Sequence, residues 1–168
     1  PPRIEYFGNT AEGVTAYDGE GFRVATVRWP VLDGVWGEGL LVSPNEKAVA
    51  AAIVIPDADQ TPEQLLGMME GIPDDSQIAR RLIANNVEVL IPTLVTRQKL
   101  ETEDARLKRS DQTEREWLYR QAFHMGRHVI GYEVQAVMAG VDWFSSRHPE
   151  LKIGITGHGE GGLVAGLE

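Results

Sequence analysis

The stretch LKIGITGHGEGGLVAGLE, residues 151–168, carries the strongest structural signal in the chain. Residues 151–156 (LKIGIT) are predicted to form a strand, and residues 163–167 (LVAGL) to lie in a helix. Between them, residues 157–162 (GHGEGG) form a glycine-rich turn. Glycine is the residue that accepts the backbone angles of very tight turns, so the pattern predicts a strand, a sharp turn and a helix.

Three interpretations of this turn remain open. In the first, Gly157 and Gly161 flank a central position of the pattern G-x-nucleophile-x-G, which holds Gly159 in this chain. In the second, Gly157, Gly159 and Gly162 form the G-x-G-x-x-G pattern that brings backbone close to the pyrophosphate of a dinucleotide. In the third, the glycines only let the helix pack closely on the sheet.

The rest of the chain alternates strands with helices. The predicted elements are a hairpin at 22–42, a buried strand at 48–55, a helix from 61, a helix at 75–85, a strand at 87–95 and a helical stripe at 117–146. The order predicts an α/β domain with a mostly parallel sheet, because parallel strands need crossover connections.

Two segments lack this periodicity. Residues 1–20 are predicted to be an irregular arm, and residues 96–114 a polar excursion with charges of both signs. The length of 168 residues is that of one domain, so residues 1–168 are predicted to form a single α/β domain.

Composition excludes several classes of function. The formal net charge of -9 argues against nucleic acid and against anionic membranes as partners, because both attract Lys and Arg. The chain has no cysteine, which excludes disulfides, thiolate metal sites and a cysteine nucleophile. His158 and Glu160 do not suffice as metal ligands, so neither a metal nor a cofactor is predicted. The compartment stays open.

From residue 127 onward the chain resembles the α/β-hydrolases, in their acetylxylan-esterase and dienelactone-hydrolase-like branch. The matching residues are Arg127, 131–135 (GYEVQ), 139–144 (AGVDWF), 147–150 (RHPE) and 152–162 (KIGITGHGEGG). The resemblance implies a three-layer α/β/α sandwich, of which this chain is the N-terminal half, incomplete at the C-terminus. A missing C-terminal half or another protein chain would then complete the sheet beside residues 151–156.

The resemblance also implies a function. The family hydrolyses carboxylic esters, including acetyl groups on carbohydrates, so a small ester or an acetylated carbohydrate is the expected ligand. The residue match implies an oxyanion hole made by the backbone of Glu160 together with that of Asp57 or Ala58. His158 and Gly162 belong to the implied nucleophile elbow. Gly159 stands where the nucleophile should be, so the chain is expected to be inactive by itself or to be a pseudoenzyme serving binding or assembly.

Overall fold

The computed structural model describes residues 3–6, 15–18, 21–99 and 112–167. In chain order the elements are β1 (Glu5–Tyr6), β2 (Thr15–Asp18), β3 (Phe22–Leu32), β4 (Val35–Pro44), β5 (Ala50–Ile55), α1 (Pro62–Leu65), the 3-10 helix η1 (Asp74–Ser76), α2 (Ile78–Ile83), β6 (Val87–Pro92), α3 (Glu114–His124), α4 (Val129–Arg147), β7 (Ile153–Gly157) and α5 (Glu160–Ala165). The predicted alternation of strands and helices is confirmed.

Within the described ranges, the strands form one mixed sheet of seven strands in the order β1-β3-β4-β6-β5-β7, with β2 paired to β3. Parallel pairing occurs where β5 meets β6 and β7, and the other pairs are antiparallel. The α/β class is confirmed, while the parallel part of the sheet is confined to β6, β5 and β7. The reason is local: β3 and β4 form a hairpin, and a hairpin is necessarily antiparallel.

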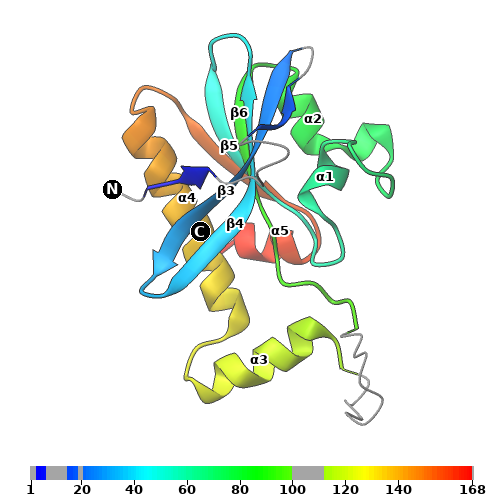
Figure 1. Ribbon diagram of the computed structural model, residues 1–168, viewed down its shortest axis with the longest axis vertical. Coiled ribbons are helices and arrows are strands. Elements are labelled where there is room, and N and C mark those ends of the chain that lie inside the picture. Colours follow the sequence, from blue (N-terminus) through cyan, green and yellow to red (C-terminus); the bar gives the residue numbers. More distant parts are fainter. Residues whose placement is uncertain (1–2, 7–14, 19–20, 100–111, 168) are drawn as a thin grey trace.

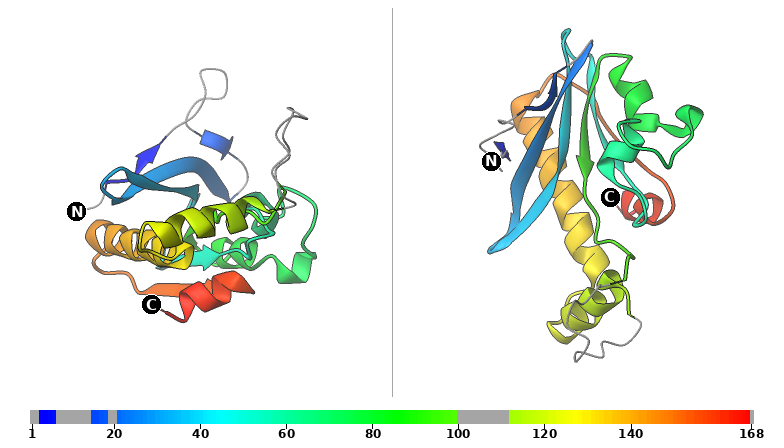
Figure 2. Two further views of the ribbon diagram at one scale, coloured as in Figure 1. Left: turned by 90° about the horizontal axis from the view of Figure 1, so that it is seen from below. Right: turned by 45° about the vertical axis from the view of Figure 1, so that its right-hand side comes forward.

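Helices cover both faces of the sheet and give the three layers (Figure 1). On one face, α4 packs Val137, Trp143 and Phe144 against the sheet, and Val164 of α5 joins the same core. On the other face, α1 and α2 pack with the apolar side chains of β4, β5 and β6. In Figure 2, α1 and α2 lie on one side of the twisted sheet, and α3 projects away from it at the start of α4.

Local signals in the sequence place several element ends. Thr61 caps α1 and exchanges hydrogen bonds with Gln64 in a capping box. Asn86 ends the α2 segment with a φ of 58°, and Gly126 separates α3 from α4 with a φ of 81°. Both positions use the left-handed backbone region that Asn and Gly tolerate better than other residues.

The prediction of an irregular arm at residues 1–20 is wrong for the residues of this segment that the structure describes. Residues 5–6 and 15–18 are strands β1 and β2, both paired antiparallel to β3. With two and four residues, these strands are too short to show an alternating pattern in the sequence. Of the polar excursion at 96–114, residues 100–111 lie outside the described residues, and Lys99 and Thr113 form an isolated β-bridge at its base.

Among the described strands, β7 has one neighbour, β5, and so lies at an edge of the sheet. None of the helices in the described ranges is long and apolar enough to cross a membrane.

Candidate functional site

The glycine-rich turn joins the end of β7 to the start of α5 at the carboxyl edge of the parallel strands (Figure 1). Gly159 has φ 57° and ψ -124°, a conformation that costs a residue with a side chain of order 1–3 kcal/mol. A Cβ on Gly157 would overlap the backbone of Gly161, and a Cβ on Gly161 would overlap the carbonyl oxygens of Ile55 and Pro56. The two flanking glycines therefore allow the turn to lie directly on β5.

Two backbone N–H groups converge on one oxygen beside this turn. The amides of Ala58 and Glu160 donate to Oδ1 of Asp57, at 2.9 and 3.0 Å. The amide of Asp57 donates instead to Oε1 of Gln60 at 3.1 Å. Of the two amides proposed from the sequence to accompany Glu160, that of Ala58 therefore faces the same point, and that of Asp57 does not.

The Asp57 side chain also fills the space above Gly159. A Cβ built on Gly159 would lie 2.5 Å from Cγ of Asp57 and 2.6 and 2.8 Å from its two carboxylate oxygens. Real Cβ atoms do not approach other atoms so closely, so any larger residue at position 159 requires Asp57 to move.

The surroundings of Asp57 stabilise its charged form. Partial burial by itself would raise the pKa of the carboxyl, but the hydrogen bonds from the amides of Glu160 and Ala58 outweigh it. Electrostatic interactions with Arg97 and with the His158 side chain act in the same direction, so the pKa of Asp57 lies below its usual value.

Two arginines bind the carboxylates around the turn. Arg97 contacts Oδ1 of Asp57 at 3.4 Å, Oδ2 of Asp59 at 2.9 Å and the carboxylate of Glu160. Arg115 donates to Oε1 of Glu160 from Nε at 2.9 Å and from Nη2 at 2.5 Å. Glu160 therefore receives both guanidinium groups, in addition to offering its own amide to Asp57.

Arg115 is the more deeply buried of the two. It makes a two-pronged pair with Glu133, at 2.6 and 2.7 Å, and donates to the carbonyl oxygen of Val95 at 3.1 Å. The side chains of Arg115 and Glu133 are only 8% and 7% exposed. Burial alone would lower the pKa of Arg115, but the hydrogen bonds and charges of Glu133 and Glu160 raise it, so the guanidinium stays charged.

No role for Arg97, Arg115 or Glu133 was predicted from the sequence. A signal for Glu133 was present, because it is a carboxylate within the apolar stripe of α4 that includes Ile130, Val134 and Val137. A charge on a buried helix face requires a partner of opposite sign. No pattern in the sequence identifies Arg115 as that partner.

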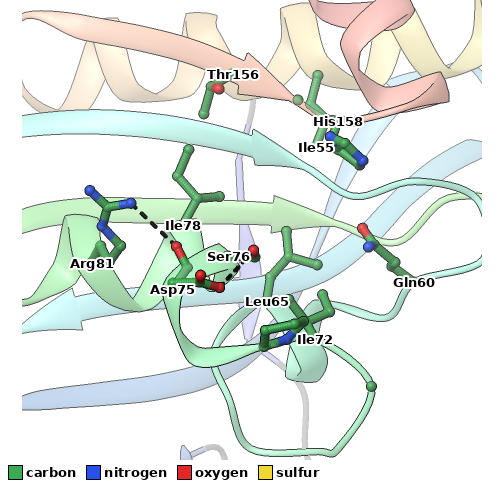
Figure 3. Close-up of a pocket in the computed structure, with 13 residues that line it drawn as sticks. Ile55, Gln60, Leu65, Ile72, Asp75, Ser76, Ile78, Arg81, Thr156 and His158 are labelled. Carbon is green, nitrogen blue, oxygen red and sulfur yellow. Dashed lines mark hydrogen bonds between the residues drawn. The ribbon is translucent and has the colours of Figure 1, made fainter.

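A pocket of about 450 Å³ lies on the other side of the turn, between β7 and the α1–α2 layer. In Figure 3, Thr156 and His158 of the β7 segment face Leu65, Ile72 and Asp75 across this space. His158 is exposed, and its amide donates to the carbonyl oxygen of Ile55 at 3.4 Å.

The turn carries donors and charges but no reactive side chain at its centre. Position 159 is glycine, and Gly162 donates its amide to the Gly159 carbonyl oxygen within the first turn of α5. Over the residues that the structure describes, no group of three or more His, Asp or Glu side chains is arranged to hold a metal ion.

Comparison with known proteins finds similarity in structure only. No family model and no curated protein sequence matches the chain. A protein from Bacteroides fragilis described as an acetyl xylan esterase superposes with a TM-score of 0.62 at 18% identity, over 99% of this chain and 44% of its own. The acetyl xylan esterase from Paenibacillus sp. R4 gives 0.60 at 14% identity, over 99% and 50%.

A cold-adapted esterase from an Arctic intertidal metagenomic library gives a TM-score of 0.56 at 14% identity, over 92% of this chain and 57% of its own. The chain thus spans about half the length of the solved structures that it matches.

These likenesses define the class of fold. The chain has an α/β-hydrolase-like fold, with helices on both faces of a central mixed sheet. The predicted resemblance to acetyl xylan esterases is confirmed at the level of the fold.

The buried pairs of Arg115 predict a large effect of its removal. Arg115→Met should lower the free energy of unfolding by about 3–5 kcal/mol, because it leaves Glu133 and Glu160 without their shared buried partner. Arg120→Met is the matched control on the same helix, since among the described residues Arg120 pairs only with the exposed Glu116 four residues away. That change should cost about 0.3–0.5 kcal/mol. Urea unfolding of both variants measures the difference. Equal losses in the free energy of unfolding would contradict the stabilising role of the buried Arg115 pairs.

The pKa of Asp57 predicts a pH dependence. A carboxyl whose folded pKa lies below its unfolded value, about 3.9, stabilises the fold above that value and loses the effect as pH falls. Asp57→Asn should therefore be less stable than the unmodified chain near neutral pH, with the difference shrinking on acidification below about pH 4. Urea unfolding across this range measures it. A difference unchanged between about pH 7 and about pH 2 would contradict the role of the Asp57 charge.

Proposed function

We propose that this chain is an esterase-type hydrolase domain segment whose turn at Gly159 corresponds to the nucleophile elbow, and that the chain does not itself hydrolyse esters. The observation that carries the proposal is the backbone of Gly159, at φ 57° and ψ -124° between the end of β7 and the start of α5. A strained residue at a strand-to-helix turn is how α/β-hydrolases expose their nucleophile, and glycine has none to expose.

The neighbouring amides support the same proposal. An oxyanion hole combines the N–H of the residue after the nucleophile with an N–H from a loop at the end of a neighbouring strand. Glu160 follows Gly159, and Ala58 lies in the loop after β5. Both amides lie within 3.0 Å of a single oxygen atom, that of Asp57. The arrangement of donors suits a carbonyl oxygen, although the nucleophile is absent from the turn.

The proposed ligand class is a small carboxylic ester or an acetylated carbohydrate. Two structural neighbours carry descriptions as acetyl xylan esterases, and these descriptions support this choice. Without a nucleophile, the role of the segment is to bind or to assemble, as in a pseudoenzyme. The alternative of dinucleotide binding through Gly157, Gly159 and Gly162 has no comparable support, because the neighbours named above are esterases.

The activity assay is direct. The 168-residue chain should give no saturable turnover of an aryl acetate and no burst of product, because position 159 cannot form an acyl-enzyme. The same protein unfolded in urea gives the background rate. A burst of product equal in amount to the folded protein, followed by saturable steady-state turnover, would refute the proposal.

We also propose that a further strand pairs with β7, supplied by another part of the same protein or by another chain. The amide of Ala51 donates to the carbonyl of Lys152, and the amide of His158 donates to the carbonyl of Ile55. Because successive amides of a strand face opposite edges, those of Ile153 and Ile155 point away from β5. Unpaired amides along an edge recruit further strands.

Two proline variants distinguish the outer edge of β7 from the edge that pairs with β5. Ile153→Pro removes an outward amide and should leave the β5–β7 pairing in place, whereas Gly154→Pro removes an amide that faces β5 and should weaken the fold. The unmodified chain should associate as its concentration rises in sedimentation experiments, and Ile153→Pro should stay folded and monomeric. A compact monomer that unfolds cooperatively at every concentration would contradict the proposal.

A further inference from the structure

One carboxylate meets two separate requirements of the turn. Its Oδ1 atom accepts the amides of Ala58 and Glu160, and the whole group occupies the space where a Cβ of residue 159 would point. The first is a hydrogen-bonding role and the second a steric one. Oδ1 takes part in both roles, Cγ and Oδ2 add to the steric one, and the single side chain of Asp57 meets both requirements.

We propose that Asp57 is a built-in occupant of this site: it blocks any side chain at position 159 and withholds two amide donors from outside ligands. This inference extends the proposed function. It depends on that function only because it takes the turn at Gly159 to correspond to a nucleophile elbow. A carbonyl or carboxylate oxygen reaches the two amides only by displacing Asp57.

Other contacts keep Asp57 in this position. Arg97 contacts Oδ1 of Asp57 and also binds Asp59 and Glu160, so it joins both sides of the site. The side chain of Asp57 is 26% exposed, which leaves it in reach of solvent and able to exchange with a ligand once these contacts break. The site is therefore closed by the chain's own polar contacts rather than by burial.

The steric part predicts coupling between positions 57 and 159. Gly159→Ala combines the cost of its positive φ with a clash against Asp57, and only the clash disappears in an Asp57→Ala background. Gly159→Ala should therefore raise the unfolding equilibrium constant roughly tenfold or more beyond its effect in the Asp57→Ala background. Urea unfolding of the four proteins of this double-mutant cycle measures the coupling.

Two further variants serve as backgrounds that distinguish the effect of the size of the Asp57 side chain from the effect of its charge. Asp57→Asn keeps the size of the side chain and removes its charge, and Asp59→Ala removes a different partner of Arg97. Gly159→Ala should cost as much in these backgrounds as in the unmodified chain. Additive effects of Asp57→Ala and Gly159→Ala would overturn the proposal, whatever the outcome of the esterase assay. If Gly159→Ala alone fails to fold, recovery of folding in the double variant supports the proposal, and failure of the double variant overturns it.

The hydrogen-bonding part has its own readout, with sodium acetate as the probe. In Asp57→Ala, acetate should shift the amide resonances of Ala58 and Glu160 together and saturably, because both donors are then free. Asp57→Asn keeps an acceptor oxygen in place, so neither it nor the unmodified chain should respond. An equal response in the unmodified chain, or none in Asp57→Ala, would overturn the claim that Asp57 withholds these donors.

Discussion

The buried guanidinium of Arg115 holds together the elements around the glycine-rich turn. It lies on α3 and binds Glu133 on α4, Glu160 on α5 and the carbonyl oxygen of Val95 after β6. A charge removed from water is tolerated only when its partners are fixed, so the positions of these elements depend on one another. Glu160 connects Arg115 to Asp57, because its carboxylate binds Arg115 and its backbone amide donates to Asp57.

Backbone packing and backbone hydrogen bonds shape the turn. Gly157 and Gly161 are required because the backbone of the turn lies against β5 and against itself. The amides of Ala58 and Glu160 point to one place because the two loops meet there. Packing and backbone hydrogen bonds therefore maintain the geometry of this turn, and no side chain at position 159 is needed for it.

The sequence predicted those parts of the fold that depend on neighbouring residues. The capping box of Thr61 and Gln64 acts across three positions, and the apolar runs of β5 and β6 mark buried strands directly. It did not predict contacts between residues far apart in the chain. One example is the hydrogen bond from the Glu160 amide to Asp57, whose partners are 103 positions apart. Asp57 was considered for its backbone, because no local pattern shows where its side chain points.

The proximity of Asp57 to Gly159 also bears on how this site can change by mutation. A Cβ at position 159 would lie 2.5 Å from Cγ of Asp57, so a lone substitution at 159 meets an occupied space. Libraries that vary one position at a time never combine a side chain at position 159 with a smaller residue at position 57. The two positions form an epistatic pair, and a search for new chemistry on this scaffold has to diversify residues 57 and 159 together.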